Sequence, residues 1–110
     1  MDSQPVMDRM KIRIKYLEDR RADLDAMVKN RNVSNALLKY RLAMEVATKR
    51  LQADKVPITL IKDRARGMCA EDEAEWEHAQ IEYKANIVMM EMASKELNAL
   101  QSMNRVTDSI

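Results

Sequence analysis

The sequence has no phenylalanine and only one glycine, one cysteine, one histidine and one tryptophan among its 110 residues. A sheet protein uses aromatic and β-branched residues in its strands and Gly or Pro in its turns, so this scarcity argues against a sheet. A single Cys69 excludes an internal disulfide and a cysteine cluster for a metal. A single glycine likewise excludes a Gly-rich phosphate-binding loop.

The residues that are abundant favour helices. Ala, Leu, Met, Glu, Lys and Arg dominate, with ten Met, and these types lose the least free energy on entering a helix. Charged residues, 34% of the chain, interrupt every apolar stretch well before the roughly 20 residues that span a bilayer. The first 21 residues show no secretory signal. We therefore expect an all-α protein without membrane contact, located in the cytoplasm (the host cytoplasm if a phage encodes it).

The helix breakers suggest how the helices are arranged. We expect a single helical domain over residues 1–110, with helix 1 at about 5–54, a connector at 55–69, helix 2 at about 70–104 and a frayed end at 105–110. Three Asn and a Ser within "KNRNVSN" compete for backbone hydrogen bonds, so helix 1 is expected to be continuous or kinked at residues 30–35. The two long helices would fold back as an antiparallel, coiled-coil-like hairpin.

The connector "DKVPITLIKDRARGMC" contains both the second proline and the only glycine. Pro57 suits the first turn of a new short helix, and it disfavours helical geometry at Val56. Gly67 suits a left-handed stop at the end of that helix. The segment is therefore predicted to be a short basic helix or loop.

Apolar residues recur at helical spacing on both long helices and predict their packed faces. Leu38, Leu42 and Val46 form a further apolar line beside the stripe of helix 1, and a hairpin supplies only one neighbour for two apolar faces. We therefore expect a homo-oligomeric bundle. Its core and oligomer contacts are predicted to be Leu37, Tyr40, Met44, Leu51, Trp76, Tyr83, Ile87, Met90 and Leu97.

Opposite charges are segregated along the chain. Residues 1–67 contain 16 Lys/Arg and 9 Asp/Glu, whereas residues 68–110 contain 3 and 9. In one interpretation the basic and acidic halves pair with each other. In the other, the basic half also binds a polyanion such as single-stranded DNA, because phosphate neutralisation needs such a surplus of cations. The candidate nucleic-acid-binding residues are Lys39, Arg41, Lys49, Arg50, Lys62, Arg64 and Arg66.

Tyr40 lies between two of these cations and has two interpretations: its ring could stack on an unpaired base, or it belongs to the core stripe where its spacing places it. The surrounding segment "ALLKYRLAMEVATKR" resembles the Leu-Lys-x-Arg-Leu helix of the phage recombination mediators (the UvsY-like family). The later "YKANIVMMEMASKELNALQSMNR" is similar to that family's second long helix, so the resemblance covers about residues 30–105.

This resemblance implies a small helical oligomer that binds single-stranded DNA and helps to load a recombinase past single-strand-binding protein. Position by position, it implies DNA contacts by Lys39 and Arg41. The alternative is a structural or protein-interaction module, such as a scaffold or host-factor inhibitor, in which the two charged halves pair.

We expect no enzyme activity, no cofactor and no metal. Catalysis requires a positioned acid, base or nucleophile with a partner. His78 is the only histidine and lies among acidic neighbours, as a surface or interface residue would. Cys69 follows a basic segment and opens an acidic one, which would suit a reactive thiolate, but we expect a structural cysteine. The carboxylates of residues 71–77 lack the Gly-containing loop of a calcium site, and their place at a helix start accounts for them.

Overall fold

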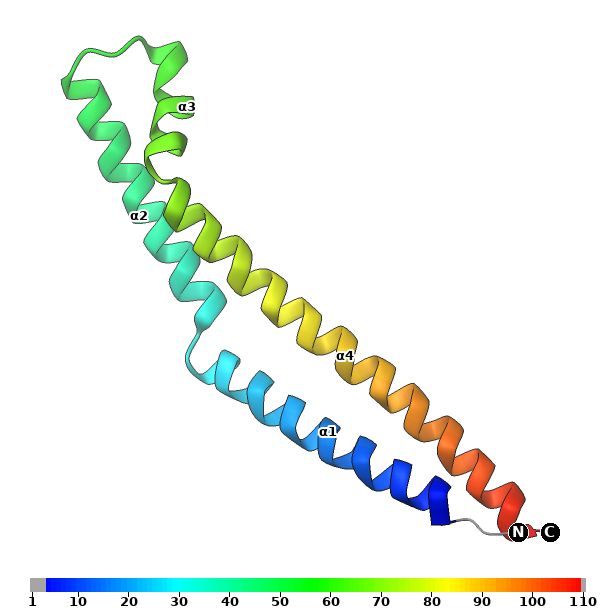
Figure 1. Ribbon diagram of the computed structural model, residues 1–110. Helices are drawn as coiled ribbons and strands as arrows, with labels where there is room; N and C mark the ends of the chain where they lie inside the picture. The colour runs from blue at the N-terminus through cyan, green and yellow to red at the C-terminus, as the bar shows by residue number, and fades with distance from the viewer. Residues whose placement is uncertain (1–3, 110) are drawn as a thin grey trace. The chain divides into compact units, whose positions relative to one another are not determined.

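A computed structural model describes residues 4–109, and the side chains of residues 4–106, as four α-helices without a strand (Figure 1). The described residues are therefore all-helical, which confirms the class predicted from composition. The helices are α1 (Gln4–Lys29), α2 (Asn32–Ala53), α3 (Ile58–Met68) and α4 (Ala70–Ser109).

The chain divides into two compact units that share α4. Unit 1 contains α1 and the part of α4 from Tyr83 onward, and unit 2 contains residues 30–82, with α2, α3 and the first part of α4. In unit 1, Arg13 lies 3.0 Å from Glu96, whereas Arg20, further along α1, meets Asn86, which is earlier on α4. The two helices of unit 1 are therefore antiparallel.

Unit 2 has the same antiparallel order between α2 and α4. Tyr40 stacks on Trp76, and Ala47, further along α2, clusters with Cys69, which precedes α4. α3 packs against α2 and closes a small core of five buried residues. These residues are Ala47, Leu51, Ile61, Ala65 and Cys69.

The long first helix is interrupted at residues 30–31, so it forms two helices. Arg31 adopts the left-handed conformation with φ 53°, a geometry that cannot continue an α-helix. The Asn35 Nδ2 group donates a hydrogen bond of 3.1 Å to the Asn30 carbonyl. An asparagine side chain thus satisfies the backbone at the interruption, as the polar "KNRNVSN" segment allows.

A hydrogen-bonded stop ends α2 before the connector. Lys55 is left-handed with φ 58°, and its N–H donates to Gln52 O at 3.0 Å, while Val56 N–H donates to Leu51 O at 3.1 Å. These two bonds form a Schellman motif, and Val56 packs against the core that contains Leu51. Pro57 then caps α3 with φ −54° and ψ 136°, so the helix begins at Ile58.

The expected left-handed stop at Gly67 is wrong. Gly67 lies inside α3, no described glycine has a positive φ, and the left-handed positions belong to Arg31 and Lys55. α3 ends instead at Cys69, whose N–H donates to Ala65 O and Arg66 O. A Cβ at Gly67 would meet nothing within 4 Å, so neither conformation nor space requires glycine there.

α4 continues to Ser109, past the end expected near residue 104. No Gly or Pro follows Gly67, so nothing in the sequence breaks the helix, and Ser102 Oγ donates to Asn98 O at 3.1 Å within it. Its first turn carries Glu71, Asp72 and Glu73, where negative charge opposes the positive end of the helix dipole.

We expect Lys55→Gly and Gly67→Ala each to raise the free energy of unfolding of unit 2 by about 0.5–1 kcal/mol. Glycine relieves the cost of a left-handed Lys55, and alanine reduces the entropy lost by Gly67 in a helix. Urea titrations monitored by the fluorescence of Trp76, the single tryptophan, measure the change. Lys62→Gly, inside α3, is the control and should lower stability by about 1 kcal/mol. A destabilising Lys55→Gly would contradict the argument.

Candidate functional site

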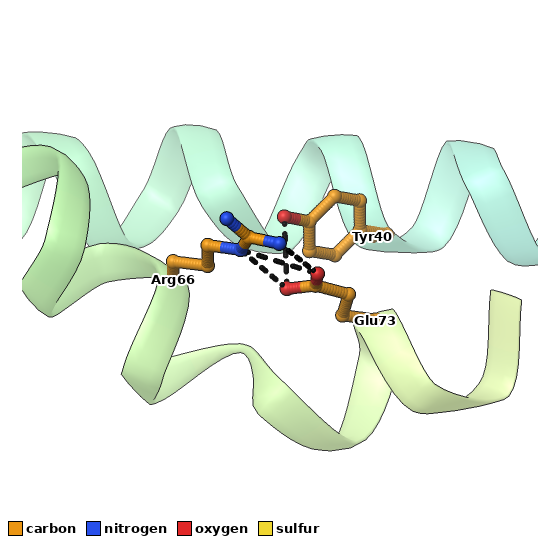
Figure 2. A network of polar contacts seen from close by, with 3 residues as sticks. All are labelled: Tyr40, Arg66 and Glu73. Atoms are coloured by element: carbon orange, nitrogen blue, oxygen red, sulfur yellow. Dashed lines mark hydrogen bonds and ion pairs between the residues drawn. The ribbon is translucent and has the colours of Figure 1, made fainter. Parts of the chain in front are cut away.

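All seven candidate DNA-binding cations lie in unit 2, and the structure separates them into paired and unpaired residues. Arg66 is the most strongly held. Its Nε donates to both carboxylate oxygens of Glu73, at 3.1 and 3.0 Å, and its Nη2 donates to Oε1 at 2.7 Å (Figure 2). The Tyr40 hydroxyl donates to Oε2 of the same carboxylate at 3.3 Å. Glu73 thus joins α2, α3 and α4.

The electrostatics of this three-residue network follow from the same contacts. Hydrogen bonds from Arg66 lower the pKa of Glu73, against the opposing effect of burial. The hydrogen bond to Glu73 raises the pKa of Arg66. Burial raises the pKa of Tyr40, and the nearby Glu73 carboxylate adds to this increase. At neutral pH the network therefore consists of a carboxylate, a guanidinium and a neutral phenol.

The ring of Tyr40 is used in packing. It stacks on Trp76 with 5.8 Å between ring centroids and 12° between planes, and both side chains are half-buried. Offset-stacked aromatic pairs contribute to stability beyond the area they bury. Tyr40 thus packs against the core cluster of unit 2.

Two further cations have acidic partners. Lys39 Nζ lies 3.0 Å from Glu75 and 3.6 Å from Asp72, so the start of α4 surrounds it with negative charge. The hydrogen bond with Glu75 raises the pKa of Lys39. Lys49 pairs with Glu45 on its own helix at 3.0 Å. These are exposed pairs, and such pairs contribute little to stability.

The other four cations make no ion pair or hydrogen bond with the residues that the structure describes: Arg41, Arg50, Lys62 and Arg64. They do not share one helix face. Arg41 and Arg50 are nine residues apart, which at about 100° per residue places them on opposite sides of α2. Lys62 and Arg64, about 200° apart, flank the buried seam of α3.

Within unit 2 the charges balance. Residues 30–82 contain nine Lys/Arg and nine Asp/Glu, so the formal net charge is zero with His78 neutral. The cationic surplus of residues 1–67 is thus offset in this unit by the first turns of α4. A polyanion would meet local positive patches rather than a positive unit.

An exposed apolar row lies on the face of α2 away from its packed seam. We define the apolar row as Leu38, Leu42 and Val46, which are 56%, 53% and 67% exposed. It borders a groove that is also lined by Met68 and Arg50. Residues spaced by four lie along one face of a helix, and this face points away from the seam that contains Ala47 and Leu51.

The predicted core residues lie on the packed faces of both units. In unit 2, Leu51 is buried, and Leu37, Tyr40, Met44 and Trp76 are half-buried. In unit 1, the four predicted residues are half-buried, namely Tyr83, Ile87, Met90 and Leu97.

Sequence reasoning missed Asn86, which is 2% exposed and whose Nδ2 donates to Arg20 O at 2.9 Å. Its place three residues after Tyr83 and four before Met90 marks the same face, so its spacing carried the signal.

The histidine and the acidic residues at the start of α4 face neighbouring side chains. His78 Nε2 lies 2.9 Å from Glu82 on an exposed surface of α4. No group of three or more His, Cys, Asp or Glu among the described side chains could hold a metal ion. The carboxylates at the start of α4 face Lys39 and Arg66 instead.

We expect the Cys69 thiol to be protected. It is 5% exposed, and burial raises its pKa, so at a given pH less of it is the reactive thiolate. At pH 8 a chromogenic disulfide reagent should react at least about 100-fold more slowly with the folded protein than with the chain in urea. Ser102→Cys combined with Cys69→Ser supplies an exposed control thiol. Equal rates for the two thiols would contradict the prediction.

No helix in the described part of the chain combines the length and the apolar character that crossing a membrane requires. No protein-family model matches the chain, and no curated protein or solved structure matches it. The functional interpretation therefore depends on the geometry of the two units.

Proposed function

We propose that the protein is a non-enzymatic helical module that assembles with further copies of itself through the apolar row of α2. The observation that carries this proposal is the exposure of all three members of the row, Leu38, Leu42 and Val46, on a helix whose opposite face is already packed. Contiguous apolar surface of this kind on a soluble helix marks an interaction site.

The charge distribution favours self-assembly over the binding of a polyanion. Two of the seven candidate DNA-binding cations, Lys39 and Arg66, face acids of α4, and unit 2 as a whole has a formal net charge of zero. Because its basic and acidic segments neutralise each other, electrostatic repulsion between copies of unit 2 is small. The alternative interpretation from the sequence, in which the charged halves pair, thereby gains the stronger support.

Sedimentation velocity of the full chain across the micromolar range tests the assembly. We expect a mass above the monomer that rises with concentration, and we expect Leu42→Asp to shift association to at least about tenfold higher concentration, because burying an unpaired carboxylate is costly. Gln52→Asp, an exposed position on the same helix and off the row, is the matched control. A wild-type chain that stays monomeric throughout would overturn the proposal.

We infer a second candidate function, the binding of single-stranded DNA, from the four cations without a partner in the described structure. Arg50, Lys62 and Arg64 are exposed, and the weak pair of Lys39 can be exchanged for a phosphate. The resemblance to the UvsY-like family implies that a DNA-binding protein of this kind would act as a recombination mediator. That role stays a prediction.

Fluorescence anisotropy with a labelled oligonucleotide tests the second candidate. We expect affinity to fall as salt increases, and Arg50→Ala with Lys62→Ala to weaken binding for every sequence and to reduce the salt dependence. Lys15→Ala is the control, because Lys15 lies in unit 1 and pairs with Asp19. Absence of binding at low salt, or an affinity that salt does not change, would exclude this function.

A further inference from the structure

We propose that two copies of the chain pair α2 against α2 in antiparallel orientation, with Leu42 on the two-fold axis and Arg41 of each copy bound to Glu45 of the other. This inference rests on the proposed self-assembly and adds the partner surface, its direction and its register. The partner is a second copy of this chain.

The spacing of the apolar row sets the register. Leu38 and Val46 lie four residues on either side of Leu42. In an isologous antiparallel pair centred on Leu42, Leu42 opposes itself and Leu38 opposes Val46 of the partner. All three members of the row are then covered, and Asn35 and Lys49 mark its polar ends.

The flank of the row is self-complementary in charge. Arg41 and Glu45 are one turn apart on the same side of α2. In the register centred on Leu42, Glu45 of the partner lies opposite Lys39 along the helix axis. Lys39 is two residues from Arg41, so Glu45 of the partner lies about 3 Å along the axis from Arg41. Antiparallel helices bring equivalent flanks together, so the symmetry produces two Arg41–Glu45 pairs.

Both members of this pair are available. Arg41 is exposed and has no partner in the described structure. Glu45 is 59% exposed and bonds only Lys49, four residues along the same helix. Such an exposed pair contributes little to stability, so Glu45 can exchange it for Arg41 at the edge of an apolar contact.

The residues on the opposite flank of the apolar row explain why an antiparallel pair is favoured over a parallel one. A parallel pair would bring Glu45 of one copy to Arg50 of the other. Arg50, however, lines the same groove as Asp72 of its own chain, so an acidic side chain already borders that groove. Arg41 makes no ion pair in the described structure, because Glu45, one turn away on the same helix, pairs with Lys49, and Arg41 therefore gains most from an acidic partner on a second copy. One helix face is a small interface, so we expect a dimer that dissociates in the micromolar range.

Charge-reversal variants of the full chain test the pairing by sedimentation equilibrium. Arg41→Glu alone and Glu45→Arg alone each place two like charges together, so each should weaken dimerisation by at least about tenfold. The double variant Arg41→Glu with Glu45→Arg should dimerise about as well as wild type. An equimolar mixture of the two single variants should form a heterodimer, because its pairs are again opposite in charge. Circular dichroism checks that each variant stays helical.

The control variant is Arg50→Glu. In the proposed register, Arg50→Glu should not weaken dimerisation as Arg41→Glu does. It should also form no heterodimer with Glu45→Arg. If Arg50→Glu rather than Arg41→Glu restores association with Glu45→Arg, the helices are parallel and the proposed register is overturned. If the wild type dimerises and no charge reversal changes its dissociation constant, the register is wrong while self-assembly stands. If the wild type is monomeric, both proposals fail.

Discussion

Leu51→Ala is expected to lower the free energy of unfolding of unit 2 by about 2–4 kcal/mol. Leu51 is 9% exposed and belongs to the core cluster with Ile61 and Ala65. Two of the five core members are alanines and one is a cysteine, so small neighbours cannot fill the cavity that truncation leaves. Loss of one leucine removes a large share of the apolar surface that joins α2 to α3.

Urea titration of the Trp76 fluorescence at low protein concentration measures this effect without a contribution from self-assembly. Leu42→Ala is the matched control, since it makes the same chemical change on the same helix at a side chain that is 53% exposed. The control should lose no more than about 1 kcal/mol. Equal losses for Leu51→Ala and Leu42→Ala would show that the core of unit 2 lies elsewhere.

Unit 2 is expected to lose stability as the pH falls below the ordinary pKa of a glutamate, about 4.3, and Glu73→Gln should reduce this loss. The folded state lowers the pKa of Glu73, chiefly through hydrogen bonds from Arg66. Between the two pKa values the unfolded chain therefore binds more protons than the folded one. The contribution of Glu73 is complete above the ordinary value and disappears as the pH falls through the folded value.

Glu73→Gln keeps the shape of the side chain and removes the charge, so it should unfold more easily than wild type at pH 7 and by a smaller margin at pH 3. Urea midpoints at several pH values supply the comparison. Glu75→Gln is the control, because Glu75 pairs with the exposed Lys39 and should contribute less. A difference between wild type and Glu73→Gln that does not change with pH would contradict the assignment of the network.

Composition and helical spacing predicted the helical class and the face on which residues such as Tyr40 and Leu51 pack. They could not predict which acid each hydrogen-bond donor meets, since Lys39 and Glu75 are 36 positions apart and Tyr40 and Glu73 are 33 apart. Which residues meet across such a separation in sequence depends on where the connector ends and α4 begins. A charge surplus counted along the chain therefore overstated the positive field that unit 2 presents.

Local conformation was the second source of error. Gly67 was expected to take the left-handed stop because glycine adopts that geometry most easily. In the structure the stop falls at Lys55, where the Schellman hydrogen bonds and the packing of Val56 compensate for a side chain in a disfavoured region. Residue preference alone does not include these tertiary contacts.

The division into units also has a consequence for the order of folding. Unit 2 is a continuous stretch of 53 residues inserted between the two segments that form unit 1. While unit 2 is unfolded, α1 can reach the later part of α4 only by closing a loop of that length, at an entropic cost of about 3–4 kcal/mol. Once unit 2 has formed, much of that cost has already been met, so α1 is expected to dock last and to be the first helix released.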